Sequence, residues 1–317
     1  MARIDRVRKE TMVLYETTLT RQVADSYRHL GWWRDRLLND GVAEAVAQYP
    51  GRTALVDARG RITYATLQES ADHCALALLV RGIRKGDVVT AQLPNWNEFV
   101  ILTLALERIG AVINPLAPVF RQHELRVMLR LAGSAAVVIP ATFRGWDYPA
   151  MYAELRRDTP SLKHLIVVGD TSNDDVNGVL SWSQLLATGA EHAATRPVLD
   201  WLRPSPDDVT ALEFTSGTTG EPKGVLHTPN TLGAALDAMI DGQHLTADDV
   251  FHMASTVGHH SGFQHGVRLP LHLGARAVFQ ETWDPAAFVR LIETERITFT
   301  LGATPFLADT LRRPEPD

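Results

Sequence analysis

Residues 209–228 read VTALEFTSGTTGEPKGVLHT, and this stretch decides how the chain is interpreted. We expect an apolar strand up to Phe214 and a second strand from Gly224 onward, with a loop of glycines and hydroxyl residues between them. Glycine tolerates positive φ, so such a loop can turn successive backbone N–H groups into one anion-binding concavity. Hydroxyls add further donors, and Lys223 adds a point charge suited to phosphate. The stretch therefore predicts a polyphosphate site.

The loop differs from the common Gly-x-x-x-x-Gly-Lys phosphate loop, because Lys223 comes three residues after Gly220, with Pro222 between them. It also joins two strands, and the next helix is expected near Asn230. The phosphates should then sit in the loop itself, with no helix dipole behind them. A Gly/Ser/Thr-rich turn without a ligand is the alternative, and the density of donors beside Pro-Lys-Gly favours the phosphate site.

Outward from this loop, apolar runs alternate with helical patterns, which predicts a mostly parallel α/β sheet. A hairpin turning at Gly60 is followed by helices that stop at Gly82 and Gly110. The expected strands are 53–57, 61–64, 87–93, 111–115, 135–139 and 165–169, and the expected helices are 66–80, 98–109 and 123–132. We divide the chain into an arm (1–30), a first α/β half (31–205) and a second α/β half (206–317) that begins with the phosphate loop.

Composition excludes several classes of protein. Hydrophobic residues make up 45% and charged residues 21% of the 317 residues, as in ordinary globular proteins. The net charge of -6, without basic blocks, gives no reason to bind nucleic acid.

Cys74 is the only cysteine, so no internal disulfide can form, and its apolar helical surroundings predict a buried, inert thiol. No secretory signal is evident, and Glu107 and Arg108 interrupt the most apolar stretch, so we expect no transmembrane segment and a cytoplasmic protein.

The loop TSGTTGEPKGV at 215–225 resembles the signature loop of the adenylate-forming superfamily, which includes acyl-CoA synthetases, luciferases and adenylation domains. Further matching stretches are ITYATL (62–67), GIRKGDVV (82–89), LPN (93–95) and RIGAVINPL (108–116), so the resemblance runs from about residue 35 to the end. It implies the layered α/β/α sheets of that superfamily's N-terminal domain. It also implies that the loop grips the ATP phosphates, with Mg²⁺ carried by those phosphates, through Thr215, Ser216, Gly217, Thr218, Thr219, Gly220 and Lys223.

A second segment is rich in histidine, with His252, His259, His260, His265 and His272. We expect no protein-held metal here, because adjacent histidines chelate poorly and no His-Glu-x-x-His or cysteine pair occurs. VGHHSGF (257–263) resembles the segment that places a histidine beside the acyl pocket in the superfamily. His259 matches best and His260 is the alternative, while a histidine hydrogen-bonded in the core is the plain structural interpretation.

The same resemblance assigns three small residues. Gly258 stands where many members have an apolar or aromatic residue, so we expect a reshaped pocket entrance. Gly302 and Ala303 map to the wall of the acyl site, where small side chains would leave room for a bulky acid.

The resemblance implies an AMP-forming acyl-CoA synthetase, an enzyme that activates a fatty, alicyclic or aromatic carboxylate with ATP and passes the acyl group to coenzyme A. The chain stops at Asp317, before the superfamily's later motifs and its C-terminal lid domain with the catalytic lysine. We therefore assign no catalytic residue within the chain and expect poor turnover from it. The alternatives are an adenylation enzyme that loads a carrier protein and an inactive nucleotide- or acyl-binding module. The sequence leaves the oligomeric state open, a homodimer included.

Overall fold

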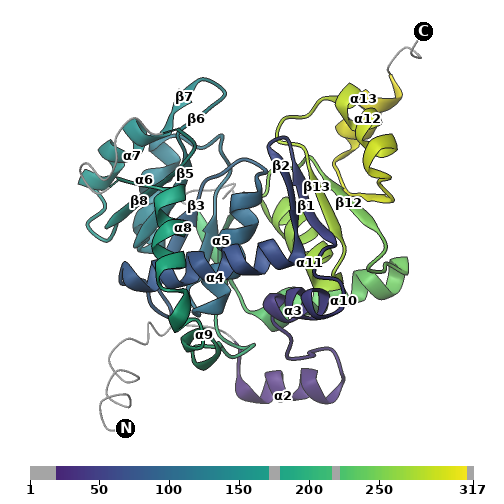
Figure 1. Cartoon of the computed structure of the whole chain (residues 1–317), viewed down its shortest axis with the longest axis horizontal. Coiled ribbons are helices and arrows are strands. Elements are labelled where there is room, and N and C mark those ends of the chain that lie inside the picture. The colour runs from purple at the N-terminus through teal and green to yellow at the C-terminus, as the bar shows by residue number, and fades with distance from the viewer. Residues whose placement is uncertain (1–18, 171–178, 216–221, 313–317) are drawn as a thin grey trace.

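The computed structural model describes residues 19–170, 179–215 and 222–312, which form two main sheets with helices between and around them (Figure 1). Neighbouring strands run parallel, except in the antiparallel pairs β1–β2 and β10–β11. The larger sheet has the order β11 (Lys223–His227), β10 (Ala211–Thr215), β4 (Val112–Pro115), β3 (Val88–Ala91), β5 (Ala136–Pro140), β8 (His164–Val168), β9 (Val179–Ser181). The smaller sheet has the order β14 (Phe299–Thr300), β12 (Val250–Met253), β13 (Arg276–Phe279), β1 (Thr53–Asp57), β2 (Gly60–Thr63).

The helices flank these sheets on several sides, and a small hairpin of β6 (Thr142–Phe143) and β7 (Trp146–Asp147) projects from the larger sheet (Figure 1). In chain order the helices are α2 (Arg21–His29), α3 (Leu38–Gln48), α4 (Tyr64–Val80), α5 (Asn97–Arg108), α6 (Gln122–Ala132), α7 (Tyr148–Arg157), α8 (Trp182–Glu191), α9 (Val198–Trp201), α10 (Pro229–Gln243), α11 (Leu269–Leu273), α12 (Pro285–Glu295) and α13 (Thr304–Leu311). A π-helical turn, Gly262–Arg268, precedes α11.

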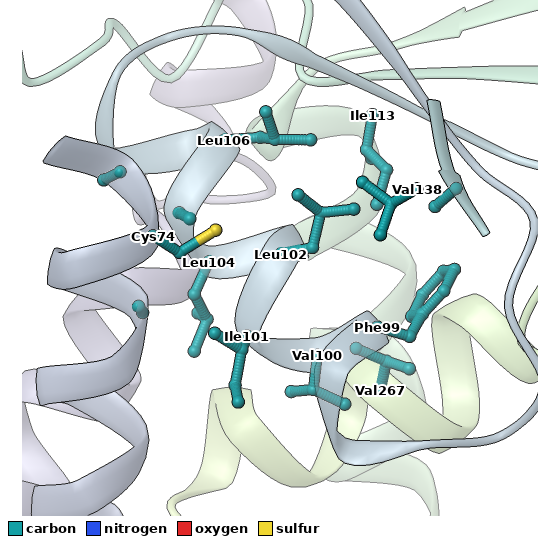
Figure 2. Packing of buried hydrophobic residues seen from close by; sticks show 14 of the residues in the cluster. Cys74, Phe99, Val100, Ile101, Leu102, Leu104, Leu106, Ile113, Val138 and Val267 are labelled. Atoms are coloured by element: carbon teal, nitrogen blue, oxygen red, sulfur yellow. The ribbon is translucent and has the colours of Figure 1, made fainter. Parts of the chain in front are cut away.

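Helix α5 lies between the two sheets, in contact with β1 of the smaller and β4 of the larger. Its residues from Asn97 to Glu107 are all buried, and most of them are apolar, as expected of a helix enclosed between two layers. Figure 2 shows Leu102 directed toward Val138, while Leu104 lies on the side of Cys74 from α4. This central layer joins both sheets into one core.

The central strands β3, β4 and β5 of the larger sheet are buried along their whole length, which explains why they are mostly apolar runs in the sequence, whereas the edge strand β11 is largely exposed. In β5, Ala136 and Val138 face the central core, whereas Val137 and Ile139 pack in a second cluster with residues of α6 and α7. Helices thus cover both faces of this sheet. The predicted α/β class with layered sheets is confirmed.

The expected strands and helices are present with their ends shifted by one or two residues, and the strand expected at 87–93 is shorter, Val88–Ala91. The hairpin forms with Leu55 opposite Ile62, but Tyr64, which was expected in its second strand, is the first residue of α4. The side chain of Thr63 caps this helix by accepting a hydrogen bond from the Thr66 amide, which ends the strand one residue early. The Tyr64 hydroxyl then donates to the buried Ala275 carbonyl oxygen at 2.6 Å. The strand prediction for Tyr64 is wrong because the capping contact outweighs its β propensity.

Cys74 is fully buried in α4, which confirms the prediction of a buried thiol, and burial raises the pKa of this thiol. Across the ranges that the structure describes, no helix combines the length and apolarity required to cross a bilayer. The division into an arm and two halves stays a prediction.

Candidate functional site

Strands β10 and β11 hold the two ends of the predicted phosphate loop together. They pair antiparallel, with Thr215 directly opposite Lys223, and both residues are exposed. The Thr215 hydroxyl donates to the Lys223 carbonyl oxygen at 3.5 Å. The expected strand–loop–strand arrangement is confirmed, and α10 follows it at Pro229, one residue before the expected start. The remaining predicted phosphate-binding residues, Ser216, Gly217, Thr218, Thr219 and Gly220, lie outside the described residues.

His260 is hydrogen-bonded to a side chain of the strand that leads into this loop. Its Nδ1 lies 3.0 Å from Oε2 and 3.3 Å from Oε1 of Glu213, which is only 6% exposed. The hydrogen bond to this carboxylate raises the pKa of His260, because it favours the charged imidazolium. Glu213 and Thr215 are two residues apart on β10 and so share a face of the sheet. The structure therefore places His260 beside the strand that leads into the predicted phosphate loop.

His259, the better match by resemblance, is exposed, and its Nδ1 is 3.5 Å from the Ser261 amide. Gly258 before it lies against the backbone of a neighbouring segment. A Cβ at this position would lie 2.3 Å from the Leu116 carbonyl oxygen and 2.5 Å from the Ala117 nitrogen. Only glycine allows this close approach to backbone, so Gly258 lets the histidine turn pack against the residues that follow β4, and its effect on a pocket entrance stays a prediction.

Asn95, the last residue of the LPN stretch, follows β3 of the larger sheet and organises the same region. Its side chain is 3% exposed and donates to the carbonyl oxygens of Ser255 at 3.0 Å and Gln280 at 3.1 Å. Its Oδ1 accepts a hydrogen bond from the Val257 amide at 2.9 Å. Asn95 thus fixes the backbone just before the two histidines, a role that nothing in its local sequence pattern indicates.

Gly302 lines a separate cavity of about 180 Å³ at the end of the smaller sheet. The residues that form the walls are mostly apolar or aromatic: His252, Ala254, Trp283, Phe288, Thr300, Leu301, Gly302, Phe306 and Leu307. Ala303 is not among them and precedes α13 as its N-cap residue. The predicted wall residue Gly302 therefore faces a cavity whose lining does not include His259 or His260.

His252 is a buried polar group of this cavity, at 2% exposed. Its Nδ1 lies 3.0 Å from Thr300 Oγ1, and its Nε2 lies 3.3 Å from Gln280 Oε1. Burial disfavours the imidazolium and lowers the pKa of His252 to about 4. The side chain is therefore a neutral hydrogen-bonding group at neutral pH.

Sequence reasoning missed Glu213 and His227, which join His260 in one cluster. His227 Nε2 lies 3.8 Å from Glu213 Oε1, and the His227 ring stacks on that of His260 with a centroid distance of 5.6 Å. Two signals were present. A glutamate interrupts an otherwise apolar strand, and the hairpin pairs His227 with Ala211, on the same face as Glu213.

Comparison with known proteins agrees with this architecture. The sequence model of the family described as "AMP-binding enzyme" matches residues 42–317, which is most of the chain. The chain belongs to this family. Among curated members of the AMP-binding enzyme family, the medium-chain fatty-acid–CoA ligase of Escherichia coli is 34% identical over 96% of the chain. The salicyl-AMP ligase/salicyl-S-ArCP synthetase of Mycobacterium tuberculosis is 32% identical over 87% of the chain.

Solved AMP-binding enzymes share the fold. Apo MbtA from Mycobacterium smegmatis aligns over 90% of the chain with a TM-score of 0.77 and 33% identity. ATP-bound MatB from Rhodopseudomonas palustris aligns over 86% of the chain with a TM-score of 0.71 and 26% identity. The chain spans about half the length of these relatives: 52% of the E. coli ligase and 51% of each solved chain. It covers the N-terminal portion of the adenylate-forming fold, as the resemblance implied.

Proposed function

We propose that this chain carries the ATP-binding and acid-binding portion of a cytoplasmic AMP-forming acyl-CoA synthetase. The observation that carries the proposal is the pairing of Thr215 with Lys223, which sets an exposed hydroxyl and an exposed cationic residue at the two ends of the loop. A phosphate tail needs such donors on both sides, because its charge is spread over several oxygens. Membership of a family whose enzymes use ATP, and the ATP-bound state of MatB, support the same assignment.

In the proposed reaction, an oxygen of the substrate carboxylate attacks the α-phosphorus of ATP. The bond from that phosphorus to the bridging oxygen breaks, and its electron pair leaves with pyrophosphate, which gives an acyl adenylate. The sulfur of coenzyme A then attacks the acyl carbon, its proton is lost, and AMP leaves as the thioester forms. In this scheme Lys223, Thr215 and the loop amides hold the phosphate oxygens, while Mg²⁺ bound to the phosphates neutralises further charge.

The histidine segment has a part in the same proposal. Because Glu213 holds Nδ1 of His260, Nε2 is the ring nitrogen left to contact the acid or the adenylate. Glu213 thereby fixes the orientation of the ring, much as carboxylates orient histidines in other sites. His259 remains the alternative contact. For the acid itself, the cavity beside Gly302 favours an apolar or aromatic group, because Trp283, Phe288 and Phe306 lie in its walls. Ala303 is the next residue after Gly302 and does not line the cavity.

A second candidate is an adenylation enzyme that transfers the acyl group to a carrier protein. The observation that favours it is the similarity to the salicyl-AMP ligase/salicyl-S-ArCP synthetase and to MbtA. The two candidates share the adenylation step and differ only in the thiol that accepts the acyl group. Transfer from a preformed acyl adenylate to coenzyme A or to a carrier protein, compared side by side, separates them.

Calorimetric titration of the chain with Mg·ATP tests the shared step. Lys223→Ala removes a charge-assisted contact to phosphate, so its affinity should fall at least about 10-fold, which corresponds to about 1.4 kcal/mol. Lys163→Ala, at another exposed lysine, is the matched control and should bind as the unmodified chain does. Equal affinities of the unmodified chain, Lys223→Ala and Lys163→Ala for Mg·ATP would contradict the assignment of the phosphate site to this loop.

The acid class is tested with acyl sulfamoyl-adenosines, in which a sulfamate replaces the phosphate. Binding of the octanoyl analogue over the salicyl analogue would favour a fatty acid, and the reverse order would favour an aryl acid. Failure of both analogues, in a chain that binds Mg·ATP, would contradict the acid-binding part of the proposal alone.

A further inference from the structure

The strand pair that carries the loop also presents three ligand groups of the kind that bind transition metals. Glu213 comes from β10, His227 from the end of β11, and His260 from the turn that begins the π-helical segment. One ligand atom from each lies within 4.8 Å of those of the other two. The closest pairs are His260 Nδ1 to Glu213 Oε2 at 3.0 Å and His227 Nε2 to Glu213 Oε1 at 3.8 Å.

These separations suit a tetrahedral ion. With bonds of about 2.0–2.1 Å to nitrogen and oxygen, neighbouring ligand atoms of a tetrahedral Zn²⁺ lie about 3.4 Å apart. The separations of 3.0 Å and 3.8 Å lie on either side of that spacing. Two histidines and one glutamate are, moreover, a ligand set that proteins use for zinc with one coordination position left open.

The charge around the cluster also favours a cation. Glu213 is buried, and its hydrogen-bond partner among the described side chains is His260. Arg268, 3% exposed, interacts electrostatically with both Glu213 and Glu107. A bound divalent ion would take the place of the His260 proton as the cation beside the buried Glu213 carboxylate.

We propose that Glu213, His227 and His260 form a binding site for a divalent transition metal, most suitably Zn²⁺, with its fourth position open toward solvent. The half-exposed side chain of His260 provides the approach from solvent. Mg²⁺ does not suit the site, because it prefers six oxygen ligands in octahedral geometry. This site revises the expectation that the histidine-rich segment holds no metal: only one of its ligands comes from that segment. The proposal does not depend on the proposed function.

The competing explanation is a simple Glu213–His260 hydrogen bond with His227 as a neighbour. Burial lowers the pKa of His227, so it can stay neutral beside the charged pair without any metal. The two explanations differ in the part played by His227. A metal requires it as a ligand, whereas the hydrogen-bonded pair does not.

The test is titration of the EDTA-treated, dialysed chain with Zn²⁺ in the presence of excess Mg²⁺, followed by calorimetry and metal analysis. Co²⁺ is the spectroscopic probe, since tetrahedral coordination gives intense visible bands. We expect one Zn²⁺ per chain and a tetrahedral Co²⁺ spectrum. His227→Ala, His260→Ala and Glu213→Gln should each weaken Zn²⁺ binding at least about 10-fold.

His259→Ala is the matched control, because it removes an exposed imidazole adjacent to a proposed ligand. It should bind Zn²⁺ like the unmodified chain, and circular dichroism should show each variant folded. His227 and His260 are partly exposed, so their variants keep the test valid even if Glu213→Gln disturbs the fold. Absence of Zn²⁺ binding, affinity unchanged in His227→Ala, or an equal loss in His259→Ala would overturn the proposal.

Discussion

The buried histidine of the cavity makes the stability of the chain depend on pH in a defined direction. His252 has a pKa of about 4 in the folded chain, compared with 6.5 for an unperturbed histidine. The unfolded chain therefore binds this proton more readily, and the contribution of neutral His252 to stability is full above pH 6.5 and decreases as the pH falls toward 4. Each pKa unit corresponds to about 1.4 kcal/mol, so the complete effect is about 3 kcal/mol, of which about 2 kcal/mol is lost between about pH 7.5 and about pH 5.

The perturbation that isolates this effect is His252→Gln, which keeps an amide able to bond with Thr300 but cannot titrate. Urea unfolding at both pH values gives the free energy of unfolding for each protein. The loss on acidification should be about 2 kcal/mol smaller in His252→Gln than in the unmodified chain. His123→Gln, which replaces an exposed histidine on α6, should lose as much as the unmodified chain does. Equal losses in the unmodified chain and His252→Gln would refute the reasoning.

Three further predictions concern the histidine turn. Gly258→Ala should destabilise the chain by about 2 kcal/mol, because its Cβ would overlap backbone atoms of Leu116, whereas the control Gly233→Ala, in open space on α10, should be neutral or stabilising by thermal unfolding. Asn95→Ala removes the acceptor of the Val257 amide and the donor to the carbonyl oxygens of Met253, Ser255 and Gln280, and should cost about 3 kcal/mol in urea unfolding; a cost near zero would contradict its organising role. In EDTA, NMR titration should place the pKa of His260 above 6.5, and Glu213→Gln should lower it; no change in Glu213→Gln would show that the carboxylate is not the cause.

Much of the scaffold could be predicted from the sequence, because each layer has its own pattern. Strands buried on both faces are continuous apolar runs such as 135–139, and the helices between them stop at glycines such as Gly110, which adopts a positive φ. The pattern of residues 209–228 also predicted correctly that two strands flank the loop. The error at Tyr64 shows where such patterns fail. A residue with high strand propensity begins a helix there because Thr63 supplies a cap.

The site was harder to predict, because its contacts join distant parts of the chain. The bonds of Asn95 reach residues about 160 positions away, and no local pattern encodes them. Glu213 and His260 are 47 positions apart, and they meet only because the turn after β12 packs beside β10. Resemblance located the histidine pair but ranked His259 first, since sequence alone does not show which imidazole faces a carboxylate. It also grouped Gly302 with these histidines, whereas Gly302 lines a cavity of its own.

The central claim is that the phosphate tail of a nucleotide binds where β10 and β11 meet. A crystal structure of the chain with Mg²⁺ and a non-hydrolysable ATP analogue tests it most directly. The account predicts phosphate oxygens within about 3.2 Å of the Lys223 ammonium and of the Thr215 hydroxyl, the range of ordinary hydrogen bonds. An analogue bound elsewhere on the chain, with Lys223 left in solvent and Thr215 bonded only to its own hairpin, would contradict it.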